Sequence, residues 1–595
     1  MDRIGLEHPD DEPTPDAAQP SRLADQLATI RQALAASPVR RTLLLYCAAI
    51  IAVILLTAGG QVLLNRWNQP FYDALQRRDL PDFLHQLVVF AEIAGGLLVF
   101  NVGQTWLSQM IRLRLREALT LDLIDQWMRP NRAFLVAKAG AIGVNPDQRM
   151  QEDAGHLCDL TTGLGIGLLQ ATILLVSFIG VLWSLSSGFV FHVDGKDFAI
   201  PGYMVWAAFL YAGSASWLSW LVGRPLIQQN SEHYAREADL RFSMMRANEH
   251  IDAIALVRGE AGERRRLELD LSTLLAAIRR IYATQINLSW VTDTYGWITV
   301  VAPILVAAPV YFAGDISFGG LMMAVGAFTQ VHNSLRWFVD NFGAIADWRA
   351  TLLRVATFRQ AILRMDELGR LDRQVDLAVN EDDRISLDDV SIAAPDICLR
   401  LSRSAFAVKP GERVLVTGGT ETQRTLLFRA LGGLWPWGEG RIGMPANDGV
   451  AFMPRAPYFP PGTLKSVIVY PFDLKKFSSE ALEGVLQRAG LARLIGSLDH
   501  VTRWERVLTD DERQCLAFAR LILQKPQWII IDGALDGLDA EAYDRIRDIL
   551  NNELRQAAVI HLGKPHLHNG LFSRQLSLEE NPDGKPLEIP ALKSA

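Results

Sequence analysis

The chain has 595 residues, of which 49% are hydrophobic and 21% are charged, with four cysteines and a formal net charge of −7. This composition is too apolar for a soluble multidomain protein or a disordered one, so it predicts a membrane protein. The acidic balance lacks the basic surface that nucleic-acid binding needs, and no nucleic-acid partner is expected. The scattered cysteines, without C-x-x-C spacing, indicate neither a disulfide framework nor a metal site.

Six apolar stretches follow a polar segment at residues 1–40. That segment lacks the order of a secretory signal, so it is expected to form a cytoplasmic tail. Each apolar stretch approaches the roughly 20 residues that a helix needs to cross a bilayer. The predicted spans lie at about 42–64, 86–107, 163–187, 202–223, 295–314 and 318–339. The last stretch is the least apolar, because it carries His332 and Arg336.

Arginine and lysine are concentrated in the segments after the second and fourth spans, which places these segments and both termini in the cytoplasm. Residues 232–280 have apolar residues at helical spacing and no proline, which predicts one long helix that continues beyond the membrane. The segment RPNRAFLVAKAGAIGVNPDQRM predicts a loop-rich elbow between two long helices. Six spans form half of a plausible translocation pathway, so we expect a homodimer in the lipid bilayer.

The pattern changes to alternating strands and helices near residues 366–380, the predicted linker. We therefore expect a membrane domain at 41–365, an α/β domain at 381–575 and a tail at 576–595. The predicted strands are RISLDDVSIAAP, ERVLVTGG, GVAFMPR and QWIIIDG, and the predicted helices are TLLFRALGGL and ERQCLAFARLIL. The fold class is an α-helical membrane domain followed by a cytoplasmic α/β domain.

The strand VLVTG, a loop and the helix TLLFRAL have the layout of a phosphate-binding loop. In the G-x-x-x-x-G-K-[ST] frame, Gly418 is the first glycine and Thr425 keeps the metal-binding hydroxyl. Gln423 replaces the second glycine, where the backbone must approach phosphate closely, and Arg424 replaces the lysine. Glu421 adds a carboxylate beside the expected phosphates. These replacements predict weak phosphate binding.

The stretches GGLWPWGEGRI, PRAPYFPPGTLKSVIVYP and VLTDDERQCLAFARLILQKPQWIIIDGALDGLD follow in the order and spacing of an ABC-transporter nucleotide-binding domain, which this domain resembles. The membrane half carries NRWNQPFYDALQRRD, NPDQRMQED, RFSMMRANEHIDAIALVRGE and SLRWFVDNFGAIADWRATLLRV. With these segments it resembles the bacterial SbmA/BacA-type peptide and vitamin B12 importers and the related peroxisomal fatty-acyl ABC half-transporters, over roughly residues 40–570.

The resemblance implies an ABC exporter-like homodimer with six spans per chain in a bacterial inner membrane, which takes up peptides or corrinoids. Some members of the group hydrolyse ATP, whereas others lack the domain and use protons. The resemblance implies that Arg455 stands where active members have the glutamine that positions water. It likewise implies that Gly533 replaces the general base and Lys564 replaces the switch histidine. Asp532 keeps the expected aspartate. No catalytic residue is therefore expected in the domain.

The signature loop, which resembles LSGGQ in other members, reads Leu508-Thr509-Asp510-Asp511-Glu512 here. Two carboxylates replace small residues at a helix N-terminus that would face ATP, and Thr509 with Glu512 forms a predicted capping box. We also expect Arg424 of one chain to pair with Asp510 and Asp511 of its partner.

If ATP is not the energy source, ionisable groups at membrane depth are the candidates for proton coupling. These candidates are Glu92, Asp293, Asp340 and His332. For Glu92 a structural hydrogen bond is the alternative, and the glycine pair 95–96 beside it is expected to permit close helix approach.

The sequence thus predicts a homodimeric importer of peptides or similar amphipathic substrates that is driven by a proton gradient and carries an inactive ATPase domain. No cofactor is expected, with weak binding of ATP and Mg²⁺ as an alternative. Two other functions stay open: an ATP-driven transporter with unusual motifs, and a regulatory subunit that transports nothing.

Overall fold

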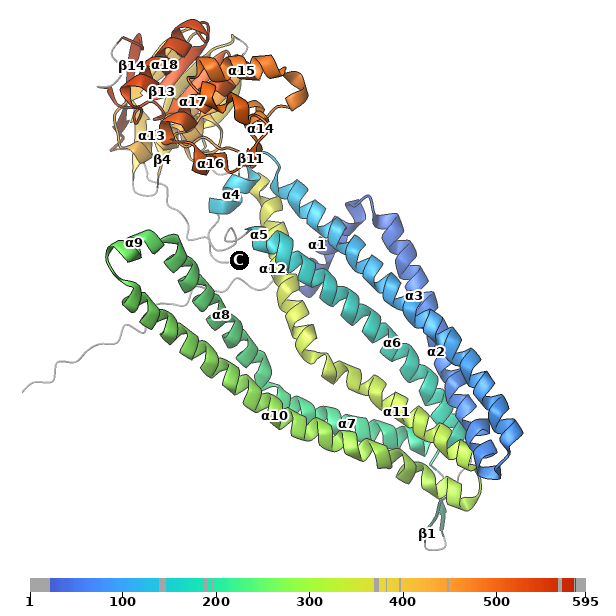
Figure 1. Cartoon of the computed structure of the whole chain (residues 1–595). Coiled ribbons are helices and arrows are strands. Elements are labelled where there is room, and N and C mark those ends of the chain that lie inside the picture. The colour runs from blue at the N-terminus through green and yellow to red at the C-terminus, as the bar shows by residue number, and fades with distance from the viewer. Residues whose placement is uncertain are drawn as a thin grey trace, which may run out of the picture. The chain divides into compact units, whose positions relative to one another are not determined.

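The computed structural model describes residues 22–138, 146–186, 191–193, 196–198, 200–368, 374–380, 382–394, 397–446, 449–565, 570–582 and 584. The chain forms two compact units, each with its own core (Figure 1). The membrane unit comprises Ser21–Gln126 and Asn145–Gln360, and the sheet unit contains Trp127–Val144 and Ala361–Ala595.

The membrane unit consists of long helices. They are α1 (Leu23–Ala36), α2 (Arg40–Arg77), α3 (Leu80–Trp127), α6 (Ala154–Ser186), α7 (Tyr203–Gly223), α8 (Pro225–Glu249), the short α9 (Ile251–Leu256), α10 (Glu260–Ala313), α11 (Phe318–Asp340) and α12 (Phe342–Leu368), whose residues from Ala361 onward belong to the sheet unit. A short hairpin, β1 (Phe191–Val193) with β2 (Lys196–Phe198), lies between α6 and α7. Within the described residues, five helical segments are long and apolar enough to cross a membrane: Arg40–Arg77, Leu80–Trp127, Pro146–Ser186, Tyr203–Glu249 and Glu260–Ala313.

The sixth predicted span, 318–339, coincides with α11, which is not among those five segments. This helix packs against α2, α6, α7 and α10, so much of its surface meets protein rather than lipid. At its start, a Cβ on Gly319 would lie 2.0 Å from the Gln69 carbonyl oxygen, which shows how closely α2 and α11 approach. Asp73 of α2 accepts hydrogen bonds from the Ser317 hydroxyl at 2.9 Å and the Gly319 amide at 2.8 Å. A helix surrounded by protein does not need the hydropathy of a lipid-facing span.

The stretch predicted as one long helix, 232–280, is broken, so that prediction is wrong in this respect. α8 ends at Glu249, α9 covers Ile251–Leu256, and α10 begins at Glu260. Arg258 has a positive φ of 52° just before Gly259, and this left-handed residue ends the helical path. α8 and α10 pack together, with Arg280 bonded to Glu232 at 2.7 Å.

The predicted elbow contains α4 (Arg132–Lys138), α5 (Pro146–Gln148) and a π-helix, η2 (Arg149–Asp153), that continues into α6. Residues 139–145 lie outside the described residues. The predicted N-terminal tail contains α1, whose Gln26 and Thr29 accept hydrogen bonds from Arg349 at 2.7 Å and Gln360 at 2.9 Å. The first 21 residues of that tail lie outside the description.

The sheet unit is built on a mixed sheet with the order β3-β8-β4-β5-β14-β7-β13-β12-β9, and β6 pairs with β4. Strands β14, β7, β13, β12 and β9 are parallel to their neighbours in that series, as in a nucleotide-binding-type α/β domain. The strands are β3 (Asp376–Asn380), β4 (Ile385–Ala393), β5 (Cys398–Leu401), β6 (Ala405–Val408), β7 (Arg413–Thr417), β8 (Gly438–Pro445), β9 (Val450–Met453), β12 (Trp528–Asp532), β13 (Ala558–Leu562) and β14 (Arg574–Glu580). The four predicted strands are confirmed.

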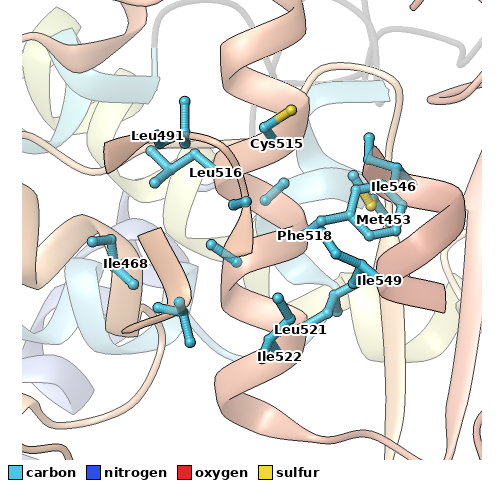
Figure 2. Packing of buried hydrophobic residues seen from close by; sticks show 14 of the residues in the cluster. Met453, Ile468, Leu491, Cys515, Leu516, Phe518, Leu521, Ile522, Ile546 and Ile549 are labelled. Atoms are coloured by element: carbon cyan, nitrogen blue, oxygen red, sulfur yellow. The ribbon is translucent and has the colours of Figure 1, made fainter. Parts of the chain in front are cut away.

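The predicted linker and C-terminal tail both contribute to this sheet through β3 and β14, while residues 369–373 and 585–595 lie outside the description. The helices are α13 (Glu421–Leu431), α14 (Leu464–Val469), α15 (Ser479–Arg488), α16 (Trp504–Val507), α17 (Asp510–Gln524) and α18 (Ala540–Asn552), with 3-10 turns η3 (Leu474–Lys476) and η4 (Ala492–Ser497). A short pair, β10 (Gly462–Thr463) and β11 (Val501–Thr502), joins the segments beside α14. Figure 2 shows the core around α17, where Phe518 and Leu521 pack near Ile546 and Ile549 of α18.

Two ion pairs connect α12 to other helices of the membrane unit, and the first of them is buried. Arg359 binds Asp122 of α3 through two hydrogen bonds of 2.7 and 3.2 Å, and both side chains are at most 10% exposed. Arg354 similarly binds Asp153, the last residue of η2, at 3.0 and 3.1 Å. The negative charge at the end of the π-helix is therefore balanced from α12.

Asp122→Asn should lower the free energy of unfolding by about 3–5 kcal/mol, because it leaves the Arg359 guanidinium buried without a counter-charge. Thermal unfolding of the purified chain in detergent measures the change. The control is Glu268→Gln, which removes an exposed pair with Arg264 and should cost at most about 1 kcal/mol. Equal melting temperatures for the two variants would contradict this prediction.

Candidate functional site

The turn between β7 and α13 has the geometry of a phosphate-binding loop. Gly418 and Gly419 have positive φ values of 84° and 58°. A Cβ on Gly418 would lie 2.4 Å from the Leu578 carbonyl oxygen, so this position has no room for a side chain. The strand, glycine turn and helix that the sequence predicts are thus present.

The N-terminus of α13 is capped by its own side chains. Thr420 accepts a hydrogen bond from the Gln423 amide at 3.4 Å, and Gln423 Oε1 accepts one from the Thr420 amide at 2.6 Å. In a phosphate-binding loop such amide groups point toward phosphate oxygens. The side chain of Gln423, which replaces the second glycine, therefore occupies a backbone amide that would otherwise donate to a phosphate oxygen.

Arg424 turns back onto the loop. Its Nη1 donates to the carbonyl oxygens of Gly418 at 3.1 Å and Gly419 at 3.0 Å, and the residue is 8% exposed. The guanidinium thus hydrogen-bonds to backbone where the lysine of an active loop extends toward the phosphates. This orientation also does not suit the predicted pairing of Arg424 with a partner's Asp510 and Asp511, which needs an accessible cation.

Thr425 and Asp532 are the two residues that keep the expected metal-binding chemistry. Thr425 Oγ1 donates to Asp532 Oδ2 at 2.8 Å. Burial raises the pKa of Asp532, although the Thr425 hydrogen bond and the charges of Arg455, Arg424 and Arg429 oppose this shift. A hydroxyl and a carboxylate at this position fit Mg²⁺, whereas the capped loop beside them does not fit the triphosphate that carries it.

A direct ion pair joins Arg455 to Glu421. Arg455 follows β9 at the position of the water-positioning glutamine, and Glu421 begins α13. The Arg455 guanidinium also lies about 3.5 Å from where a Cβ on Gly533 would be, and Gly533 has φ +60°. The side chain nearest to the general-base position is therefore that of Arg455, which is already paired with a carboxylate.

The predicted capping box at the start of α17 is confirmed. The Glu512 amide donates to Thr509 Oγ1 at 3.3 Å, and the Thr509 amide donates to Glu512 Oε2 at 3.1 Å. Arg493 contacts Glu512 Oε1 from η4, with its Nε at 2.8 Å. Burial alone would raise the pKa of Glu512, but hydrogen bonds from Arg493 and Thr509 outweigh it and hold the pKa below its usual value.

A cavity of about 660 Å³ brings several predicted positions together. Arg455, Gly533, Asp510 and Asp511 line it, and Arg513, which binds Asp510 at 2.9 Å, lines it too. Arg424 and Thr425 are not among its lining residues. The structure thus groups the glutamine, general-base and signature positions around one cavity and leaves the loop cation apart from it.

A buried pair of His561 and Asp536 was not predicted from the sequence. Their Nε2 and Oδ1 atoms lie 3.2 Å apart, and both side chains are at most 1% exposed. Asp536 also accepts from the Lys564 amide at 3.2 and 3.3 Å, so the switch position is linked to the loop after β12 through its backbone. The structure leaves no room for a side chain at Gly563, because a Cβ there would lie 2.2 Å from His561 Nε2.

α4 belongs to the sheet unit although the sequence analysis assigned its segment to the membrane domain. Asn131 donates to the Gly433 carbonyl at 3.3 Å, and the Arg429 guanidinium lies 5.7 Å from the centre of the Phe134 ring. Both contacts join the segment of α4 to the end of α13 and the turn after it.

The four proton-coupling candidates differ sharply in environment. Glu92 and Asp293 are exposed on α3 and α10, and Asp340 is bonded to Arg336 at 2.9 Å. His332 is buried, with 3% exposure. Nothing lies within 4 Å of a Cβ on either glycine of the pair 95–96, so the expected close helix approach is absent within the described chain. In the described ranges, no hydrogen bond or ion pair joins any two of the four candidates.

Comparisons with known proteins agree with a membrane transporter architecture. Residues 32–312 match the family model "ABC transporter transmembrane region 2". The chain is 29% identical over 523 residues to the inner membrane ABC transporter ATP-binding protein YddA of Escherichia coli, with 87% of this chain and 91% of that protein covered. It is 25% identical to the chloroplastic ABC transporter D family member 2 of Arabidopsis thaliana, covering 87% and 80% of the two chains. Mouse lysosomal cobalamin transporter ABCD4 is 27% identical, covering 79% and 81%.

Glu512→Gln should destabilise the chain by about 1 kcal/mol at neutral pH, through loss of a capping and ion-pair contact. Because the folded pKa of Glu512 is depressed, this stabilisation is present above the ordinary glutamate pKa of about 4.3 and disappears as the pH falls through the folded value. Melting temperatures of the full chain between about pH 6 and pH 3.5 test this. The difference between wild type and variant should shrink on acidification, whereas exposed Glu483→Gln should show no such trend. A constant difference would contradict the assignment.

Proposed function

We propose that this chain, an ABC-type membrane protein by its similarities, is one subunit of a homodimeric inner-membrane transporter whose nucleotide-binding-type domain does not hydrolyse ATP. The proposed cargo is a peptide or another amphipathic molecule, and the proposed direction is import. The proposed energy source is the proton gradient.

The observation that carries the proposal is the contact between Glu421 and Arg455. It gives Arg455, a cation that lines the cavity, a carboxylate partner from the same chain. Triphosphate binding would place anionic oxygens beside Glu421 and would have to compete with that carboxylate for Arg455. Phosphate would also have to displace Gln423 from the Thr420 amide. Binding of ATP is therefore unfavourable at three neighbouring points.

Hydrolysis lacks its reactive groups as well. A general base contributes roughly 10²–10⁴-fold to such reactions, and Gly533 has no side chain to accept a proton. Arg455 occupies the position of the amide that orients water. In ABC transporters, each ATP site combines the phosphate-binding loop of one chain with the signature loop of its partner. Because both loops of this chain are altered, each of the two sites in a heterodimer would contain one altered loop.

Two other functions keep specific support. Thr425 and Asp532 retain a metal-binding pair, which favours an ATP-driven transporter with unusual residues. The self-capped helices α13 and α17 favour a regulatory subunit whose domain serves only for assembly. One relative is named a cobalamin transporter, so a corrinoid is the alternative cargo.

The homodimer proposal is supported by unpaired apolar surface. In α3, only 6% of the most apolar window is buried within one chain, so lipid or a second copy must cover the rest. Ion pairs from Arg424 to a partner's Asp510 and Asp511 would require Arg424 to leave the loop carbonyls. Asp510 itself is accessible, with its side chain 92% exposed.

Purified protein in liposomes tests the energy source directly. Labelled peptide uptake should follow an imposed pH gradient, stop with an uncoupler and be indifferent to ATP on either side. Cobalamin in place of peptide distinguishes the two cargo classes. Uptake that requires ATP, together with phosphate release, would overturn the proposal in favour of the ATP-driven alternative, and no flux with either energy source would favour the regulatory subunit.

Millimolar ATP with Mg²⁺ should leave the melting temperature of the wild type unchanged, since a bound ligand raises stability by RT ln(1 + [L]/Kd). The matched variant restores the phosphate loop through Glu421→Ser, Gln423→Gly, Arg424→Lys and Arg455→Gln. If these residues are the obstacle, ATP at 100 times Kd should stabilise that variant by about 2.7 kcal/mol. A clear upward shift in the wild type would contradict the prediction.

A further inference from the structure

We propose that His332 is a proton-binding site whose protonation is linked to separation of α11 from α7 and α10. This inference deepens the proposed function and rests on it for the link to uptake. The ligand is a single proton, which binds a lone pair of the imidazole ring and converts it to imidazolium.

His332 lies in the most protein-enclosed helix of the membrane unit. It is 3% exposed, next to Val331 at 0% and one turn after Phe328 at 2%. Within the described residues, its Nδ1 atom is buried and has no hydrogen-bond partner. A buried polar atom without a partner is costly, and such exceptions in native structures call for an explanation.

Three helices meet at this histidine. The ring of Tyr211 from α7 lies 5.1 Å from the His332 ring, with an interplanar angle of 47°. The same Tyr211 hydroxyl donates to the Tyr295 carbonyl of α10 at 2.6 Å and lies 2.7 Å from the Thr299 hydroxyl. Tyr211 therefore connects His332 on α11 to the backbone of α10 through one side chain.

The charged surroundings disfavour an imidazolium in this packing. On α11, Arg336 lies one turn away and is bonded to Asp340, which lies a further turn away. The titratable group that contacts His332 from a neighbouring helix is the phenol of Tyr211 on α7, and the Tyr295 ring of α10 lies 5.5 Å from the Tyr211 ring. Within the described part of the chain, no carboxylate forms an ion pair with His332, and no charged side chain of α2 or α6 contacts it. An imidazolium would lose its hydration and gain no direct counter-charge.

The consequence is a thermodynamic linkage between protonation and packing. The neutral ring fits the closed contact, whereas the charged ring requires water, which enters only if α11 separates from α7 and α10. Acidification should therefore favour the separated state, with at most a tenfold change in the equilibrium per pH unit for one proton. Glu92 and Asp293 are exposed outside such a contact, so their protonation has no comparable effect on helix packing.

Hydrogen exchange of the full chain in liposomes at pH 7.5 and 5.5 tests the linkage. Protection factors, which remove the intrinsic pH dependence of exchange, are compared for peptides covering 205–215, 292–302 and 326–338. In the wild type they should fall by up to about tenfold per pH unit. His332→Gln and His332→Leu, which carry no titratable group, should abolish the fall, and exposed His85→Gln should retain it.

Absence of any fall in the wild type overturns the proposal, and so does an equal fall in a folded His332 variant. Gradient-driven peptide uptake is measured on the same samples. Loss of uptake in both His332 variants, with wild-type uptake in His85→Gln, supports the role in transport. If the wild type shows no gradient-driven uptake, the proposed function fails, while the exchange comparison still decides whether His332 is the proton site.

Discussion

The pocket of the sheet unit depends on the ion pair between Glu421 and Arg455. A carboxylate at the first position of α13 would repel phosphate, and the arginine after β9 is the cation that pairs with it. Together they neutralise each other and join two segments of the sheet unit that lie 34 positions apart in the sequence. The other changes are consistent with this pair, because Gln423 and Arg424 satisfy backbone groups that a bound nucleotide would otherwise satisfy.

The sequence was sufficient for features that depend on short spacing. The glycine turn, the strands of the sheet and the Thr509–Glu512 cap all follow from residues within a few positions of each other. The equivalent cap formed by Thr420 and Gln423 has the same spacing, but it lies where the phosphate-binding motif predicts a glycine instead of a capping residue. The Glu421–Arg455 pair and the inward turn of Arg424 were not readable, since they depend on where β9 and α13 meet in space.

The membrane unit shows a different limit. Hydropathy reports how a segment partitions from water into lipid, so it identifies helices that face lipid more surely than helices enclosed by protein. α11 packs against protein on several sides, and the polar side chain of His332 lowers the hydropathy of this helix. The same polar side chain, buried in the helix, is the proposed proton site. Glu92 is the opposite case, because its sequence neighbours are apolar but no part of the same chain covers its side chain. Helical periodicity also continued across Arg258, whose left-handed backbone ends the helix.

Within the described residues, the chain enters the sheet unit twice, first with the segment that contains α4 and then from Ala361, in the last third of α12, onward. A single proteolytic cut between residues 368 and 374 therefore cannot release the sheet unit intact. The fragment after such a cut would lack Asn131 and Phe134, and it would expose the Gly433 carbonyl and the Arg429 side chain that they contact. Studies of the isolated C-terminal portion consequently concern an incomplete folding unit, and co-expression with a peptide spanning 127–144 is the appropriate way to complete it.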